Sequence, residues 1–264
     1  MANDSLTFHE TFPPELQYLS RLLELDNTPR LKEDISELTA IPTGKSSGKV
    51  IPHLKYGQYM NLWKLTHHQG KYALELLPLG KRIREVDRYL SSDETLWLLH
   101  TGLAGSRGAA LWRWFFNWSS TVAWCKDREQ LKVLAQESFH RKNVNLSPLL
   151  TTYSADRSLA RLRLVKADSS VCVLPHEFDN AMSLVAMWSL LQEWEIVFPD
   201  RTDLTLDEVS EQLRWRWLFA WPDAEFYEAL NRIKEQGLLS LDRKLKPAVV
   251  SPRVTRTELL SRLF

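Results

Sequence analysis

The stretch Leu62–Ile83 reads LWKLTHHQGKYALELLPLGKRI and decides the predicted fold of the N-terminal third of the chain. Apolar and polar residues alternate in it, which predicts two short β-strands, Leu62–Leu65 and Tyr72–Leu76. The letters HHQG between them predict a hairpin turn in which Gly70 supplies a positive φ angle. The residues that follow, LGKRIREVDRYL, begin another helix.

Three helices are predicted before this hairpin. ELQYLSRLLEL places leucines on one face and ends near DNTP, and Leu31–Leu38 again has apolar residues at helical spacing. A third helix reaches Asn61 and starts at about Lys49, because Pro52 is tolerated only in a first turn. Helix, turn, helix, two-stranded hairpin, helix is the order of a winged helix-turn-helix domain. Its core-facing residues would be Val50, Leu54 and Met60.

The loop IPTGKSSGKV, residues Ile41–Val50, resembles a phosphate-binding loop but fails in its details. A P-loop needs four residues between its glycines and a Ser or Thr after the lysine. Here three residues separate Gly44 from Gly48, and Val50 follows the lysine. A helix precedes the loop where a buried strand is required. The loop is therefore interpreted as a helix-to-helix connection, and an NTPase is excluded.

Composition limits the partners that the chain can have. Among 264 residues, 34 are basic and 33 acidic, so the net charge is +1 and any nucleic-acid-binding surface has to be local. No signal peptide is recognisable, and no apolar run approaches the length of a membrane span, which predicts a soluble, cytoplasmic protein without a membrane partner.

The two cysteines, Cys125 and Cys172, form no CxxC motif and have no regular histidine spacing around them. A zinc site is therefore not expected, and the pair is interpreted as buried free thiols in a reducing cytosol. No cofactor and no metal are predicted.

The fold class expected is mainly α with small β-hairpins. Three regions are predicted: a winged helix-turn-helix domain at 1–90, a helical middle domain at 91–150, and a helical domain at 151–264 that ends in a helix and a hairpin. The last helix is capped by Gly237 and the hairpin turns at DRK. This end could be a second winged helix, but its upstream helix spacing is not clean, and the question stays open.

Basic and short polar residues cluster between positions 45 and 84, on the predicted helix-turn-helix frame. Lysines and small polar side chains there suit phosphate oxygens and base edges of double-stranded DNA. The alternative is a protein-docking module whose basic residues are merely solvated. The candidate DNA-contacting residues are Lys45, Ser46, Ser47, Lys49, His53, Lys55, His67, His68, Lys71, Lys81 and Arg82.

The run LWRWFFNW is apolar on more than one side of a helix. Leu111, Trp114, Phe115 and Trp118 share one face, which is expected to be core. Trp112 and Phe116 lie beside or opposite that face and are predicted to contribute to a protein-binding surface.

Few residues suggest catalysis. No nucleophile, zincin or acidic metal motif is present. The letters HEFD, with His176, Glu177 and Asp179, are the nearest to a metal or acid–base site, and a surface loop is the preferred interpretation. His100, flanked by apolar residues, is interpreted as a core histidine with satisfied hydrogen bonds.

Four stretches together resemble the bacterial DUF4007 family: FHETFPP at Phe8–Pro14, the segment Leu38–Leu62, LLPLGKRI at Leu76–Ile83, and DETLWLLHTGLA at Asp93–Ala104. They cover about the first 120 residues. Members of that family look like companions of genes for DNA modification and phage defence, notably for phosphorothioation, in which sulfur replaces a backbone oxygen. The resemblance names no catalytic residue. One element departs from it, because ELQYL stands where a basic, aromatic continuation such as RYGWL is expected.

The function expected is that of a non-enzymatic DNA-binding or targeting subunit of such a system. Its partners would be double-stranded DNA and other protein subunits, with a homodimer left open. A winged-helix transcription regulator, a protein-docking scaffold and an enzyme with an unrecognised site are the alternatives.

Overall fold

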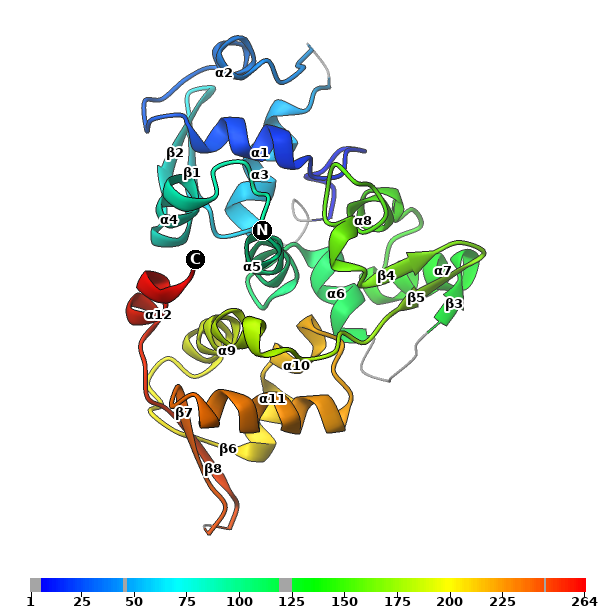
Figure 1. Ribbon diagram of the computed structural model, residues 1–264. Coiled ribbons are helices and arrows are strands. Elements are labelled where there is room, and N and C mark those ends of the chain that lie inside the picture. Colours follow the sequence, from blue (N-terminus) through cyan, green and yellow to red (C-terminus); the bar gives the residue numbers. More distant parts are fainter. Residues whose placement is uncertain (1–5, 45–46, 119–124, 245) are drawn as a thin grey trace.

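The computed structural model describes residues 6–44, 47–118, 125–244 and 246–264 (Figure 1). The fold is mixed α/β, with about half of the chain in helices and with small antiparallel sheets. The buried apolar side chains form one continuous cluster that extends from Phe8 to Leu263. No helix of the described residues is long and apolar enough to cross a bilayer.

The N-terminal unit, residues 16–76, contains three helices and a hairpin. In order they are α1 (Leu16–Leu23), α2 (Lys32–Thr39), α3 (Val50–Tyr59), β1 (Trp63–His68) and β2 (Lys71–Leu76). Arg30, between α1 and α2, pairs with Tyr72 of β2 through hydrogen bonds of 2.9 and 2.7 Å in opposite directions. Strand β2 thus lies between Arg30 and β1.

The hairpin is longer than predicted, with six residue pairs from Trp63↔Leu76 to His68↔Lys71. Gln69 and Gly70 form its turn, and both have positive φ angles, 48° and 78°. The predicted role of Gly70 is confirmed. Two positive φ angles match the twist of the flanking strands, which lets the hairpin project without distortion.

Helix α3 is fixed in place by the first residue of the hairpin. The indole Nε1 of Trp63 donates to the carbonyl of Leu54 at 2.8 Å. A Cβ at Gly57 would lie 1.9 Å from the Trp63 ring, so only glycine allows this approach. The predicted core residues Val50, Leu54 and Met60 are all fully buried.

The middle of the chain surrounds a helix that is buried along nearly all of its length. This helix, α5 (Asp93–Ala104), lies end-on at the centre of Figure 1, and its residues Thr95–Ala104 are all buried. The remaining elements of this part are α4 (Pro78–Val86), α6 (Ala110–Trp118), β3 (Cys125–Asp127), α7 (Arg128–Phe139), α8 (Ser147–Thr152), η1 (Ala160–Leu162), β4 (Val165–Ala167), β5 (Ser170–Val173) and η2 (Asn180–Met182).

His100 connects its helix to two distant segments of the chain from within the core. Its Nδ1 lies 2.8 Å from the hydroxyl of Tyr153, and its Nε2 lies 2.7 Å from the carbonyl oxygen of Leu218. Complete burial lowers the pKa of His100 to about 4, so the ring is neutral. The interpretation of His100 as a satisfied core histidine is confirmed.

The prediction that Trp112 and Phe116 form a partner surface is wrong, because both side chains are fully buried. Phe8 and Tyr56 pack against Trp112, with ring centroids 5.9 and 5.6 Å away. His100 and Tyr153 pack against Phe116, at 4.6 and 5.2 Å. The second apolar side of α6 is thus covered by the same chain. The side chain of Trp118 lies outside the described residues.

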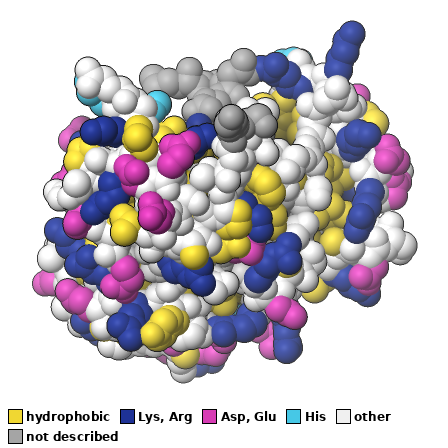
Figure 2. All heavy atoms as spheres, turned by 90° about the horizontal axis from the view of Figure 1, so that it is seen from above, with side chains coloured by type: hydrophobic (Ala, Val, Ile, Leu, Met, Phe, Trp, Pro, Cys, Tyr) yellow, Lys and Arg dark blue, Asp and Glu magenta, His cyan; other side chains and the backbone are white. Residues whose placement is uncertain are grey.

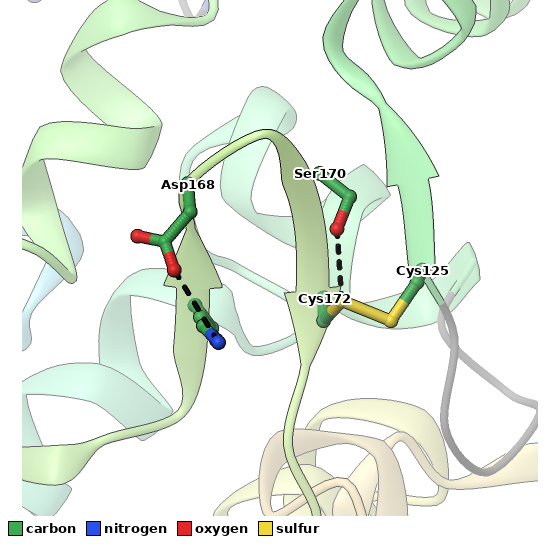
Figure 3. The surroundings of a disulfide bond; sticks show 5 residues. Cys125, Asp168, Ser170 and Cys172 are labelled. Atoms are coloured by element: carbon green, nitrogen blue, oxygen red, sulfur yellow. Dashed lines mark hydrogen bonds and ion pairs between the residues drawn. A yellow bond between two sulfur atoms is a disulfide. The ribbon is translucent and has the colours of Figure 1, made fainter.

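The two cysteines are also different from the prediction. Cys125 and Cys172 face each other across β3 and β5 and form a disulfide (Figure 3). Cys125 is exposed and Cys172 is buried, so the interpretation as buried free thiols is wrong. The bond closes a segment with a sequence separation of 47 residues, which brings together two strands that no local pattern connects.

The C-terminal unit, residues 183–252, repeats the strand order of the N-terminal unit. It contains α9 (Ser183–Val197), β6 (Leu204–Thr205), the π-helix η3 (Glu208–Gln212), α10 (Trp215–Leu218), α11 (Asp223–Glu235), β7 (Leu239–Asp242) and β8 (Val249–Pro252). Strand β6, which follows the first helix, pairs with β8, and the sheet order is β6-β8-β7.

The last helix, α12 (Arg256–Arg262), returns to the N-terminal third and packs against both α9 and α4. The Arg82 guanidinium on α4 donates to the carbonyl of Leu263 at 3.3 Å. Helix α12 therefore lies between the two halves of the chain (Figure 1).

Candidate nucleic-acid interface

The β1–β2 hairpin is one exposed part of the predicted DNA-binding region. Side chains alternate along its strands, so that the paired residues Leu65 and Leu74 face the body of the protein. Lys64, His68 and Lys71, on the opposite face, are exposed. His67 is exposed as well and stacks on Tyr72, with centroids 4.3 Å apart and an interplanar angle of 11°. The hairpin therefore presents two lysines and two histidines, and the exposed carboxylate of Glu75 lies opposite Lys64.

The loop before α3 leads directly into the N-terminus of that helix. Thr43 and Gly48 pair as an antiparallel bridge, and the Lys32 ammonium donates to the carbonyl of Gly44 at 2.8 Å. A Cβ at Gly48 would lie 2.6 Å from the Cα of Thr43. Ser47 is exposed. The predicted contacts Lys45 and Ser46 lie outside the described residues.

Lys49 is held by a carboxylate of its own chain. Its ammonium lies 2.7 Å from Oε1 of Glu15, and only 27% of its side chain is exposed. The rings of Phe12 and Tyr18 lie below the ammonium, at 5.7 and 5.3 Å. The charge of Lys49, which the sequence assigned to DNA contact, is thus already compensated by Glu15. Glu15 is the first residue of ELQYL, the stretch that departs from the family pattern.

The prediction that His53 contacts DNA is wrong, because the side chain is fully buried. Its Nε2 accepts the backbone N–H of Glu15 at 3.0 Å, and its Nδ1 lies 2.6 Å from the carbonyl oxygen of Lys49. Burial lowers the pKa of His53 to about 4, which the hydrogen bond to Lys49 only partly opposes. The ring is a neutral connection between α1 and α3.

Helix α3 as a whole faces the protein more than the solvent. The segment before α1 covers it: the Tyr56 hydroxyl donates to the carbonyl of Phe12 at 2.8 Å, and Phe8 packs against Tyr56 and Tyr59 at 4.8 Å each. Lys55 is half-buried. A helix covered in this way cannot insert its length into a major groove, which leaves the loop and the hairpin as the accessible parts.

The remaining two predicted contacts lie at the other end of the hairpin. Lys81 is exposed on α4, whereas Arg82 is directed to the carbonyl of Leu263. A strand of six residues spans about 17 Å, which separates α4 from the hairpin tip. The structure therefore divides the predicted set into a hairpin group, a loop group and an α4 group.

The surface around these groups carries both signs of charge. Figure 2 shows the face at the top of Figure 1, where lysines and arginines alternate with aspartates and glutamates. Helix α2 contributes Glu33, Asp34 and Glu37 to the acidic side chains of the N-terminal unit. Binding of a polyanion there has to rely on short-range contacts.

The letters HEFD do not assemble a metal site. His176 Nε2 lies 2.9 Å from the sulfur of Met182, Glu177 is exposed, and Asp179 accepts the backbone N–H of Ala181. Burial lowers the pKa of His176, and the nearby acids Asp179 and Glu177 oppose this. No group of three or more His, Cys, Asp or Glu residues that could hold a metal ion occurs among the described residues.

Residues 7–156 match the model of a family described as "Protein of unknown function (DUF4007)". The chain belongs to the DUF4007 family. The match covers more than half of its length and includes Phe8, α3, the hairpin and His100. No curated protein sequence matches this DUF4007 protein.

Two solved structures share the fold of this DUF4007 protein. The first is described as "Magnesium ion-bound SspB crystal structure", with a TM-score of 0.75 and 14% identity, and the alignment covers 98% of this chain and 86% of that one. The second is described as "SspB crystal structure", with a TM-score of 0.74, 13% identity and the same coverage. At such identities the likeness concerns the fold alone.

The sequence interpretation missed several exposed cations. Lys64 belongs to the hairpin and could have been found from the alternation of WKLTHH, which places it on the same face as His68. The cations of the C-terminal hairpin, in the letters DRKLK, were read only as a turn. Their charge was visible in the sequence, but the projection of the hairpin was not.

Proposed function

We propose that this DUF4007 protein is a non-enzymatic DNA-binding subunit of a bacterial DNA-modification or phage-defence system of the phosphorothioation type. The association with phosphorothioation rests on the family resemblance and on the likeness to the two SspB structures along 98% of the chain. The N-terminal unit acts as a winged helix in this proposal, with the β1–β2 hairpin as its wing.

Strand pairing supports the winged-helix interpretation. In such a domain a short extended segment between the first two helices pairs with the second strand of the hairpin, and Arg30 pairs with Tyr72 in that way. The single observation that carries DNA binding is the exposed hairpin face with Lys64, His68 and Lys71, where two lysines outnumber the one acid, Glu75. Neither lysine forms an ion pair with any residue that the structure describes.

The burial of α3 determines the mode of contact. Side chains of the hairpin and of the loop around Ser47 can reach phosphate oxygens, while His53 and most of α3 cannot reach base edges. Contacts to phosphates fix position but carry no direct sequence information. The N-terminal unit is therefore proposed to hold DNA without reading its sequence.

The test compares two variants in fluorescence-anisotropy titrations with duplex DNA at several salt concentrations. Lys64→Ala/Lys71→Ala should weaken binding, and the slope of log K against log salt should decrease by about 0.9 for each lost phosphate contact. Lys142→Ala, which removes an exposed lysine outside this unit, is the control and should bind like the parent. A folded hairpin variant with unchanged affinity and slope rules out this site.

A second candidate function, protein docking, is favoured by α2. The side chains of Leu31 and Leu38 are 41% and 62% exposed, whereas Ile35 between them is buried. Exposed leucines two helical turns apart can anchor another protein. Leu38→Asn should then abolish co-purification with companion subunits at unchanged thermal stability, while Leu65→Asn, on the covered side of the hairpin, should lower stability instead.

A further inference from the structure

The C-terminal unit carries a second hairpin that extends further from the body than the first. In Figure 1 the β7–β8 hairpin projects from the lower edge of the molecule, away from the other elements. It follows α11, and its strand β8 lies between β6 and β7. This arrangement repeats that of α3, Arg30 and the β1–β2 hairpin, so both units display a hairpin in the same structural context.

The second hairpin is strongly basic. Residues 238–253 include four basic side chains and one acidic side chain, a net charge of +3. Lys234, at the end of α11, adds a fifth cation beside them. All five are exposed, and they are Lys234, Arg243, Lys244, Lys246 and Arg253. The corresponding residues 62–77 of the first hairpin, which also extend one residue beyond each strand end, have a net charge of only +1.

The acid of this hairpin does not neutralise its cations. Oδ1 of Asp242 accepts the backbone N–H of Lys244 at 2.8 Å, which shapes the turn. Arg243 donates to the amide oxygen of Asn231 at 3.0 Å, a neutral partner. Among the described residues, none of the five cations forms an ion pair. Their charge is available for an external anion.

Three of the cations line one open hollow. It has a volume of about 610 Å³ and lies along β7, the strand at the edge of the sheet. Lys234, Lys244 and Arg253 contribute positive charge to it and Asp242 contributes one carboxylate, while Ser240 and Ser251 lie on neighbouring strands of its lining. Ammonium and guanidinium donors on a concave, exposed surface suit phosphate oxygens.

Helix α11 is unsuited to the negatively charged grooves of DNA. Its first turn contains Asp223 and Glu225, and Asp223 is paired with Arg216 at 2.7 Å. Glu228, one turn later, is paired with Arg232 at 2.6 Å. Acidic side chains at this end would be repelled by phosphates, whereas the hairpin and the other end of the helix would be attracted.

We propose that the β7–β8 hairpin, with Lys234 and Arg253, binds the phosphodiester backbone of duplex DNA without sequence preference. This adds a second contact to the one on the β1–β2 hairpin and rests on the proposed function only in requiring that the protein bind DNA. Because four to five cations can contact phosphates here, this site contributes more affinity and more salt dependence than the first.

The experiment measures binding of two duplexes of unrelated sequence by the full-length parent and three variants. Arg243→Ala/Lys244→Ala/Lys246→Ala should weaken both duplexes by about tenfold or more at low salt and lower the salt slope by up to about 2.7. The matched control, Arg141→Ala/Lys142→Ala/Arg163→Ala, removes the same charge from exposed positions outside both units and should change neither. The third variant is Lys64→Ala/Lys71→Ala.

The outcomes separate the two proposals. If the variant of the second hairpin binds like the parent while Lys64→Ala/Lys71→Ala loses affinity, this inference is overturned and the proposed function stands. A parent that binds neither duplex overturns both. If the second-hairpin variant weakens only one of the two duplexes, the claim of sequence-independent contact is wrong. Equal losses for the matched control mean that net charge alone is measured, which also overturns the site.

Amide hydrogen exchange of the parent gives an independent readout, because it needs no variant to fold. Duplex DNA should slow exchange in residues 239–252, and the slowing should disappear at high salt. Unchanged exchange there in a DNA-bound parent would contradict the proposed site.

Discussion

In the N-terminal unit, Gln58 is the one residue of the fully described helix α3 that is exposed, whereas in the C-terminal unit Tyr227, Glu228 and Arg232 of α11 all face solvent. The two hairpins share a strand order but differ in charge: the first has a net charge of +1 and the second a net charge of +3. A common arrangement of strands thus supports two surfaces with different chemistry.

This difference shows where connectivity stops being informative about function. The strand order depends on buried residues such as Trp63 and Val250. Two units can therefore share a strand order while their exposed residues differ. The units differ in two ways. The segment from Phe8 to Glu15 covers α3, and the two hairpin tips carry different charges. Three predictions test how far the contrast extends.

The largest effect is expected from the buried side of the comparison. Trp63→Ala removes a fully buried ring and its hydrogen bond to Leu54, and the free energy of unfolding should fall by about 3–5 kcal/mol. Tyr227→Ala, on the exposed face of α11, should change it by no more than about 0.5 kcal/mol. Urea denaturation measures both. Similar losses for the two variants would show that α11 is covered as α3 is.

An intermediate effect is expected from acid. The pKa of His53 is about 4 in the folded protein and 6.5 in the unfolded chain, so the unfolded chain binds more protons between these values. The stability that this neutral ring supplies is complete above pH 6.5 and is lost as the pH falls toward 4, by up to about 3 kcal/mol. The C-terminal unit contains no histidine of its own, and acid acts on it through His100, whose ring contacts the carbonyl of Leu218.

The measurement is urea denaturation at a series of pH values, with hydrogen exchange to locate the loss. His53→Gln should flatten the dependence of stability on pH, although His100, with its own pKa of about 4, keeps part of it. His68→Gln, on the exposed hairpin, is the control and should leave the slope unchanged. Parallel slopes for the parent and His53→Gln would contradict the prediction.

The smallest effect concerns a single cation in each unit. Lys49→Met keeps the packing over Phe12 and Tyr18 but removes the ion pair with Glu15, which should cost about 1 kcal/mol of stability and leave DNA affinity nearly unchanged. Lys244→Met should do the reverse, weakening DNA binding without an effect on stability. Thermal denaturation and anisotropy titrations of the same samples check both. If Lys49→Met weakens DNA binding and Lys244→Met does not, the DNA contact lies in the N-terminal unit alone.

The sequence predicted those features that depend on neighbours along the chain. The hairpin, the positive φ of Gly70 and the burial of Val50, Leu54 and Met60 all follow from local alternation or helical spacing, and the structure confirms them. His100 was also interpreted correctly, because apolar residues flank it on both sides.

The features that the sequence did not predict depend on distant segments. His53 is buried because it packs against the segment at Glu15, 38 residues earlier, whose backbone N–H it accepts. Trp112 is buried because Phe8 packs against it. The two cysteines pair across 47 residues. Strand β6, which completes the sheet of the C-terminal unit, has only two residues and carries no periodicity of its own.

Helix α12 has a consequence for the order in which the chain folds. The strand pairings of each hairpin unit lie within one continuous stretch of the chain, residues 16–76 or 183–252, whereas α12 reaches α4 across most of the chain, as the contact between Arg82 and Leu263 shows. Closing so long a loop is slow relative to local contacts, because its entropic cost precedes any gain. We therefore expect both hairpins to form early and the docking of α12 to complete folding, with the apolar faces of α4 and α9 open to solvent until that step.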